Sequence, residues 1–222
     1  MCIRDSFKSG WFHLGADFEN SAPTRGSPLN GDHALNVARE RITFLMVGTI
    51  EPRKGYLQVI DAFTLLWDKD YAVNLMIVGK EGWKDLSPSM RRDIPLTMDR
   101  LLNHERLNKN LFWFEGLSDE YLEKLYKASS CLIAASYDEG FGLPLIEAAQ
   151  HKLPMMVRDI PVFREVATQY ASYFKAGNAS ELANEISDWI KLREKHEMPK
   201  SAEMPYLSWR KSAEELKKFI CS

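Results

Sequence analysis

The sequence has little cysteine, little net charge and no long apolar run, and each shortage excludes a class of protein. Its three cysteines in 222 residues are scattered and lack the spacing of metal ligands, which indicates a reducing compartment and no cysteine metal site. A formal net charge of −2 gives no electrostatic reason to expect nucleic acid or an acidic membrane as a partner. No run reaches the roughly 18 apolar residues of a membrane span, and no signal-peptide pattern opens the chain.

Two common nucleotide-binding loops are absent as well. The sequence contains neither the G-x-x-x-x-G-K-[ST] phosphate loop nor the G-x-G-x-x-G dinucleotide fingerprint. An acidic triplet with the D-x-D spacing of some metal sites occurs at residues 68–70. It falls at the end of a predicted helix, away from the edge of the sheet where ligands bind, and we interpret it as a solvated turn.

The sequence does contain a regular alternation of apolar runs and amphipathic segments. Short apolar runs predict strands at residues 42–47, 73–78, 111–114, 131–135, 154–157 and 173–174. Helical periodicity predicts helices at residues 56–67, 119–128, 145–150, 179–195 and 207–220, and helical segments around Pro88 and Pro95 within residues 87–103. Strands that are apolar throughout are typical of parallel sheets covered on both faces. The alternation therefore predicts an α/β fold, a Rossmann-like doubly wound parallel sheet followed by C-terminal packing helices.

The chain is expected to consist of an N-terminal arm and one domain. Residues 1–38 are interpreted as a linker, because residues 15–32 are rich in Pro, Gly, Ser, Thr and Asn. Residues 39–222 are interpreted as the Rossmann-like domain with its packing helices. Residues 1–9 show neither periodicity nor a helix cap, and we hypothesise that they are not native and that the chain is truncated at its N-terminus.

The most informative stretch is EGFGLPLIE, which places Glu139 and Glu147 at the two ends of nine residues. It links the predicted strand at 131–135 to the predicted helix at 145–150. An open α/β sheet binds ligands at this kind of junction, where free N–H groups of a helix attract anions. Gly140 and Gly142 would let backbone N–H groups approach a ligand without an intervening Cβ. We therefore predict a ligand site in this turn.

Each glutamate has two interpretations. Glu147 lies among apolar neighbours near the start of a helix, where a carboxylate needs a partner. That partner is either a ribose diol, which we favour, or the free N–H groups of the helix itself. Glu139 is either an acceptor for a sugar hydroxyl at the mouth of a cleft or an exposed loop acid.

A second loop, GTIEPRKG at residues 48–55, follows the strand at 42–47. Gly48 permits a tight turn after the strand, and Arg53 and Lys54 stand directly before the next helix. Two neighbouring cations at this edge suit a diphosphate, with Arg as a planar fork and Lys as a point charge. The alternative is a solvated loop that carries two surface cations.

Together these motifs resemble the C-terminal, donor-binding half of a GT-B glycosyltransferase of family 4, the retaining group. Residues 139–147 match its E-x7-E signature, and residues 47–55 resemble its phosphate-contacting loop. Shorter matches at residues 75–79, 114–118 and 208–209 occur in the same order along the chain as in the family. Residues 11–17 resemble the family's interdomain segment. The EPRK form of the loop resembles the bacterial mannosyltransferase-like branch.

The resemblance implies a role for each matched residue. Arg53 and Lys54 would bind the donor diphosphate and stabilise the charge on the leaving group, and Glu139 would contact the transferred sugar. The remaining donor-binding positions would be Gly48, Gly140, Phe141, Gly142, Leu143 and Glu147, with Glu147 on the ribose. Many members carry Arg directly after the first-loop glycine; here that residue is Thr49, so we expect Arg53 to supply the charge.

The resemblance also implies the reaction and its partners. The expected activity is transfer of a hexose, with mannose favoured, from a nucleotide-sugar to a glycan or lipid-linked acceptor with retention, without cofactor or metal. The expected partners are the nucleotide-sugar donor, a missing N-terminal GT-B domain and the acceptor, with no nucleic acid. The expected location is the cytoplasm, at the inner face of the membrane in the full-length protein.

We expect the isolated chain to be inactive in transfer. Two other functions stay open on the sequence. One is a non-catalytic module that binds nucleotide-sugars, and the other is a different GT-B enzyme such as an epimerase or a phosphorylase.

Overall fold

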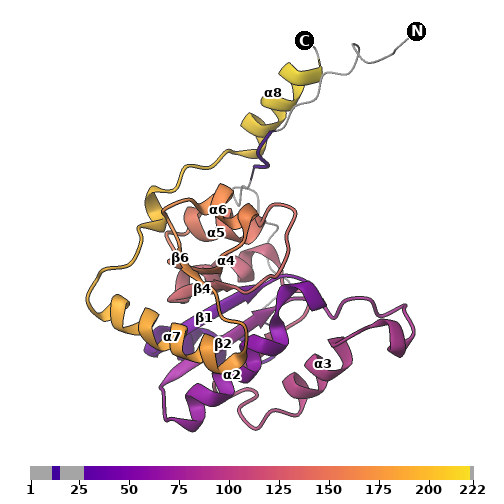
Figure 1. Cartoon of the computed structure of the whole chain (residues 1–222), viewed down its shortest axis with the longest axis vertical. Helices are drawn as coiled ribbons and strands as arrows, with labels where there is room; N and C mark the ends of the chain where they lie inside the picture. Colours follow the sequence, from indigo (N-terminus) through magenta and orange to yellow (C-terminus); the bar gives the residue numbers. More distant parts are fainter. Residues whose placement is uncertain (1–11, 16–27, 221–222) are drawn as a thin grey trace.

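The computed structural model describes residues 12–15 and 28–220, and Figure 1 shows the arrangement of their helices and strands. The expectations for residues 1–9, and for most of the N-terminal arm, lie outside the described residues. Six parallel strands form one sheet in the order β3-β2-β1-β4-β5-β6. The strands are β1 (Ile42–Val47), β2 (Val73–Val78), β3 (Leu111–Phe114), β4 (Cys131–Ala134), β5 (Met155–Arg158) and β6 (Ser172–Phe174). The predicted doubly wound parallel sheet is confirmed.

Helices cover both faces of this sheet because its strands expose apolar side chains on both sides. The helices are α1 (Gly31–Glu40), α2 (Tyr56–Asp68), α3 (Ile94–Leu102), α4 (Asp119–Ala128), α5 (Leu143–Gln150), α6 (Pro161–Ala167), α7 (Ala179–Glu194) and α8 (Trp209–Ile220). Short 3-10 turns occur at η1 (Pro52–Lys54), η2 (Pro88–Met90) and η3 (Ser201–Glu203).

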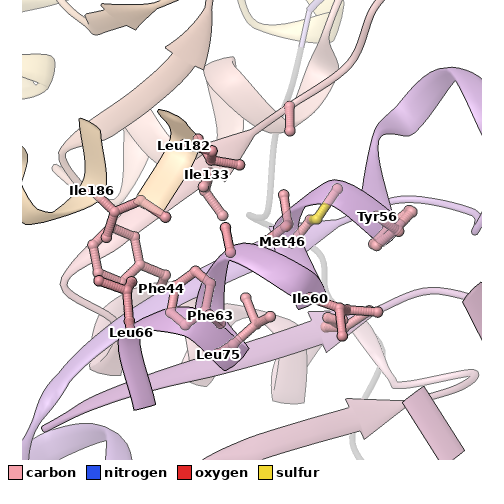
Figure 2. Packing of buried hydrophobic residues seen from close by; sticks show 14 of the residues in the cluster. Phe44, Met46, Tyr56, Ile60, Phe63, Leu66, Leu75, Ile133, Leu182 and Ile186 are labelled. Atoms are coloured by element: carbon pink, nitrogen blue, oxygen red, sulfur yellow. The ribbon is translucent and has the colours of Figure 1, made fainter. Parts of the chain in front are cut away.

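The sheet separates two hydrophobic clusters. Phe44 of β1 and Leu75 of β2 point to the side of α2 and α7, where Phe63 and Trp189 are buried (Figure 2). Leu45, the neighbour of Phe44, points to the opposite side, where α1, α4, α5 and α6 pack. This alternation is the period of two of a β-strand, with both faces apolar.

Two helices, α1 and α6, were not predicted. α1 lies at residues interpreted as linker and start of domain, and it packs into the core through Ala34, Leu35 and Ala38. Because most of these buried residues are small, the segment carries a weak apolar signal between the Pro- and Gly-rich arm and β1. α6 spans only seven residues and begins at Pro161, which is too short for a clear helical period.

The last helix, α8, projects away from the sheet at the end of an extended segment (Figure 1). The hydroxyl of Ser212 in α8 donates to the carbonyl oxygen of His13 at 2.7 Å, and Gly15 forms a parallel bridge with Leu207. Residues 12–15 are therefore attached to the start of α8. Within the described ranges, no helix is both long and apolar enough to cross a membrane.

Candidate functional site

Two loops meet at the carboxyl edge of the sheet because the strands that they follow are neighbours. β1 and β4 pair in parallel, through Phe44 with Cys131 and Leu45 with Leu132. β1 leads into η1, which carries the two cations, and β4 leads into the turn before α5. The backbone N–H of Tyr137 in the second loop donates to the carbonyl oxygen of Arg53 in the first at 2.7 Å. This bond ties the two loops together.

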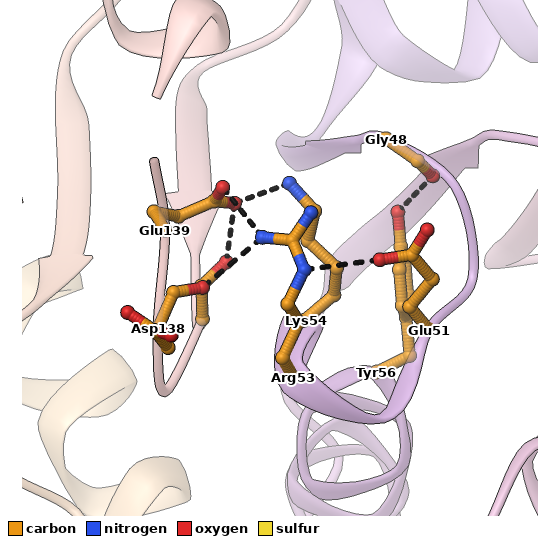
Figure 3. A network of polar contacts seen from close by, with 8 residues as sticks. Gly48, Glu51, Arg53, Lys54, Tyr56, Asp138 and Glu139 are labelled. Carbon is orange, nitrogen blue, oxygen red and sulfur yellow. Dashed lines mark hydrogen bonds and ion pairs between the residues drawn. The ribbon is translucent and has the colours of Figure 1, made fainter. Parts of the chain in front are cut away.

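Glu139 is the centre of a polar network between these loops (Figure 3). One terminal nitrogen of Arg53 donates to Glu139 Oε2 at 2.7 Å, and Lys54 Nζ donates to Glu139 Oε1. Ser136 Oγ donates to the same Oε1 at 3.0 Å, and Arg53 Nε also donates to Glu51 Oε2 at 3.0 Å. The structure therefore brings the predicted cation pair directly against the first glutamate of the motif.

These contacts keep Glu139 ionised although its side chain is only 8% exposed. Burial raises the pKa of the Glu139 carboxyl, but hydrogen bonds from Lys54 and Arg53 outweigh burial and hold it below its usual value. The hydrogen bond to Glu139 in turn raises the pKa of Arg53. From the sequence, the cations were expected to bind a phosphate and the carboxylate a sugar, and their pairing with each other was not predicted.

The second glutamate, Glu147, lies in α5 and is anchored from α4. Tyr126 donates its hydroxyl to Glu147 Oε2 at 2.6 Å, and the Tyr126 ring stacks on His151 with centroids 5.3 Å apart. Burial raises the pKa of Glu147, Tyr126 lowers it, and the nearby charge of Asp119 raises it, with a net rise. Among the described residues no backbone N–H donates to this carboxylate. The helix-capping interpretation of Glu147 therefore finds no support.

One cleft of about 630 Å³ contains both loops and both glutamates. Arg53, Lys54, Glu139 and Glu147 line it together with Leu14 of the N-terminal segment. Every other donor-binding position from the sequence analysis also lines this cleft: Gly48, Gly140, Phe141, Gly142 and Leu143. The residues that the two motifs contribute thus border a single hollow at the carboxyl edge of the sheet.

The two glycines of the motif have different local requirements. Gly142, the residue before α5, has a φ of +89°, and a Cβ there would lie 2.9 Å from the ring of Phe163. Gly140 has no atom within 4 Å of such a Cβ. The fold therefore requires glycine at position 142, whereas at position 140 only the approach of a ligand could require it.

A buried arginine fixes the turn that carries Glu139. Arg158 of β5 is 8% exposed, and its Nε donates to the carbonyl oxygen of Ala135 at 2.9 Å. Its terminal nitrogens donate to the carbonyl oxygen of Ala176 at 2.7 Å and to Gln58 Oε1. The guanidinium also lies 4.1 Å from the centre of the Tyr137 ring. Burial lowers the pKa of Arg158. Arg158 thereby joins the ends of β4 and β6 to α2.

The D-x-D triplet at residues 68–70 lies outside this network. Asp68 is the last residue of α2, as expected for a solvated turn. His13 packs edge-on against Phe141, with ring centroids 5.7 Å apart, and lies 3.6 Å from Glu165. Within residues 12–15 and 28–220, no group of three or more His, Cys, Asp or Glu side chains could hold a metal ion. The expectation that no metal is required stays a prediction.

The strand order and the polar cleft at the carboxyl edge define a Rossmann-like α/β domain. Residues 32–203 match the family described as glycosyl transferases group 1, and the chain belongs to this family. Several known proteins are similar to this chain in sequence or in structure.

Among curated relatives, the serotype-specific mannosyltransferase WbdA of Escherichia coli is 45% identical over 207 residues, which cover 93% of this chain and 24% of WbdA. The O-antigen chain mannosyltransferase RfbU of Salmonella typhimurium is 33% identical over 130 residues, covering 59% of this chain and 33% of RfbU. The chain thus spans about a quarter of the length of WbdA.

Solved structures confirm the GT-B type of fold. HepE of Anabaena, in complex with UDP and glucose, superimposes with a TM-score of 0.66 at 17% identity, over 88% of this chain and 53% of HepE. The C-terminal domain of the group 1 glycosyl transferase LpcC from Francisella tularensis gives a TM-score of 0.58 at 17% identity, over 86% of this chain and 94% of that domain. At these identities the likeness concerns the fold alone.

Proposed function

We propose that this chain is the donor-binding half of a retaining GT-B glycosyltransferase of family 4. In the whole protein, it would take part in transferring mannose from a nucleotide-sugar to a glycan or lipid-linked acceptor during O-antigen synthesis. The observation that carries this proposal is the single cleft in which Arg53, Lys54, Glu139 and Glu147 meet. The names of WbdA and RfbU, both mannosyltransferases, favour mannose as the sugar.

In this proposal the four residues divide the donor between them. Arg53 and Lys54 bind the diphosphate and stabilise the charge that develops on the leaving group. Backbone N–H groups at Gly142 and Leu143, at the start of α5, add to this anion site. Glu139 accepts from the transferred sugar, and Glu147 accepts from the ribose.

Donor binding in this arrangement exchanges one anion for another. Arg53 and Lys54 both donate to Glu139, so a diphosphate has to compete with that carboxylate for the same nitrogens. Once the phosphate oxygens accept from the cations, Glu139 can accept from sugar hydroxyls instead. The exchange couples recognition of the diphosphate to recognition of the sugar.

In the proposed reaction the protein's own cations stabilise the negative charge on the leaving group, so transfer needs neither metal nor cofactor. It locates the protein in the cytoplasm, with the full-length enzyme at the inner face of the membrane. Transfer by the complete enzyme that persists with a chelator in excess would support the metal-independent reaction, and its loss with restoration by a divalent cation would overturn it.

Calorimetric titration with UDP-, GDP- and ADP-sugars tests donor binding. We expect one base to bind clearly better than the others. We expect the double substitution Arg53→Gln, Lys54→Gln to weaken that donor by about a hundredfold or more, since each charged hydrogen bond contributes about 1.5–3 kcal/mol. The matched control is Lys217→Gln, Lys218→Gln on α8, which removes the same charge far along the chain and should leave binding unchanged. If no nucleotide-sugar binds to the unaltered chain, the donor-site proposal is wrong.

A further inference from the structure

We propose that Tyr126 is a positioning residue for nucleotide recognition, whose hydroxyl fixes one oxygen of Glu147 so that the other is presented to a ribose hydroxyl. The inference rests on the proposed function, because it takes Glu147 as the ribose acceptor. Tyr126 belongs neither to the glutamate motif nor to the cation loop. It comes from α4, the helix that precedes β4.

The geometry of Tyr126 leaves its hydroxyl little freedom. The residue is 1% exposed, and its hydroxyl lies 2.6 Å from Glu147 Oε2, within the short range of hydrogen bonds to a charged acceptor. Its ring stacks on His151, the residue after α5, with an angle of 22° between the planes. Burial and stacking together hold the Tyr126 side chain in one position. Tyr126 therefore links α4 to both Glu147 and the end of α5.

The protonation states suit this role. Burial raises the pKa of Tyr126 well above its usual value, so its hydroxyl remains a donor at neutral pH. Burial also raises the pKa of Glu147, and the hydrogen bond from Tyr126 opposes that rise. Tyr126 thus favours the carboxylate form of Glu147, which accepts hydrogen bonds at both oxygens.

The remaining oxygen, Glu147 Oε1, is the atom that the cleft can use. Glu147 lines the cleft, and in the part of the chain that the structure describes, its carboxylate accepts only from Tyr126. Oε1 is not among the buried side-chain atoms that lack a partner, so it is not sealed inside the protein. One oxygen is therefore tethered, and the other is available to a ligand in the hollow that Glu147 lines together with Arg53 and Lys54.

A purely structural role for the Tyr126 hydroxyl predicts a different outcome. If the hydroxyl only supports the packing of α4 on α5, its removal should weaken every ligand of the cleft by the same factor. If it positions Glu147, its removal should matter only for ligands that carry the hydroxyl contacted by Oε1. The interaction between a protein group and a ligand group is measured by a double-mutant cycle in which one change is made in the ligand.

The experiment uses the 222-residue chain and calorimetry. GDP, UDP and ADP are titrated first, and the tightest binder is then compared with its 2′-deoxy and 3′-deoxy forms. We expect Tyr126→Phe to weaken the ribonucleotide by about tenfold, the loss typical of one hydrogen bond to a charged group. For the deoxy form that lacks the contacted hydroxyl, we expect the same substitution to change affinity by less than about twofold. Glu147→Gln should remove this difference between ligands.

The matched control is Tyr121→Phe on the same helix. Tyr121 is also 1% exposed, but its hydroxyl has no hydrogen-bond partner among the described residues. We expect all three affinities to stay unchanged in this variant. Equal losses for the ribonucleotide and both deoxy forms in Tyr126→Phe would overturn the positioning role while leaving the donor site intact. Failure of the unaltered chain to bind any of the three nucleotides would overturn both.

Discussion

At the scale of single residues, Glu139 has two functions that exclude each other in time. It neutralises Arg53 and Lys54 in the structure, and in the proposed reaction it contacts the sugar. A carboxylate that competes with the ligand for the same cations lowers the affinity of the site for a bare diphosphate. The net effect of Glu139 on the affinity for a nucleotide-sugar depends on the hydrogen bonds that Glu139 forms with the sugar hydroxyls.

Glu139→Gln should therefore tighten binding of the nucleoside diphosphate. We expect a gain of about fivefold, because partly exposed ion pairs contribute up to about 1 kcal/mol and Arg53 is 43% exposed. Transfer by the complete enzyme should fall in the same variant, because the sugar contact is lost. Calorimetry with the nucleoside diphosphate measures the gain, and Glu214→Gln on α8 controls for a general change in net charge. Weaker diphosphate binding in Glu139→Gln would contradict the exchange.

Glu147 gives the site a pH dependence. Because burial raises its pKa, this carboxyl takes up a proton at a higher pH than an ordinary glutamate as the solution is acidified. The proton removes an acceptor for the ribose, so ribonucleotide affinity should fall as the pH drops through the raised pKa. Calorimetry over the acidic range measures this decline, and Glu147→Gln should flatten it. A decline of the same size in Glu147→Gln would assign the effect to another group.

Residue identities predicted which side chains meet, but not how they pair. Arg53, Lys54 and Glu139 follow neighbouring strands, so their approach could be expected from parallel topology alone. Tyr126 is buried, on a helix that the sequence predicts. Its contact with Glu147 joins residues 21 positions apart on two helices, and it depends on how α4 and α5 pack, which local periodicity does not encode.

At the scale of elements, the turn between β4 and α5 is conformationally demanding at one glycine and permissive at the other. Gly142→Ala should destabilise the chain by about 1–3 kcal/mol, since the left-handed conformation costs an L-residue about 1–2 kcal/mol and the new methyl group would press on Phe163. Gly140→Ala is the matched control and should stay within about 0.5 kcal/mol. Urea unfolding measures both. Equal stabilities for the two variants would contradict the assigned strain.

The clamp formed by Arg158 should be a second determinant of this turn. Arg158→Met leaves the buried carbonyl oxygen of Ala135 without its donor and that of Ala176 with Gln58 Nε2 as its remaining donor. We expect a loss of about 3 kcal/mol in unfolding free energy. Arg210→Met, at an 88% exposed side chain on α8, should cost less than about 0.5 kcal/mol. Denaturant unfolding compares the two variants, and a loss in Arg158→Met no larger than the control would show that the clamp is dispensable.

Strands were predicted better than helices for a physical reason. The predicted ranges 42–47, 73–78 and 111–114 coincide with β1, β2 and β3. Each is apolar apart from one polar residue in β1, Thr43, and one in β2, Asn74, and each is followed by a polar residue or glycine. α1 was missed because its buried side is built mainly from small residues, Gly31, Ala34 and Ala38 with Leu35. The apolar and polar sides of such a helix differ little in the sequence, and α1 becomes evident only from its packing against α4.

At the scale of the whole molecule, the chain covers about a quarter of WbdA, and we propose that the acceptor site of the whole protein lies outside these residues. We predict that the 222-residue chain binds the nucleotide-sugar but transfers little or no sugar to an acceptor. A transfer assay with the complete enzyme as the positive control measures this. Transfer by the chain at a rate comparable to that of the complete enzyme would show that the acceptor site lies within these residues.

The sheet divides the interior into two layers that, within residues 12–15 and 28–220, share no buried residue, with Phe63 in one and Phe163 in the other. Side chains without common partners contribute to stability independently, so a truncation at Phe63 cannot be offset by repacking around Phe163. Losses in the two layers should simply add. A destabilising mutation on the α2 side therefore leaves the effect of one on the α5 side unchanged in size, while both lower the same unfolding free energy.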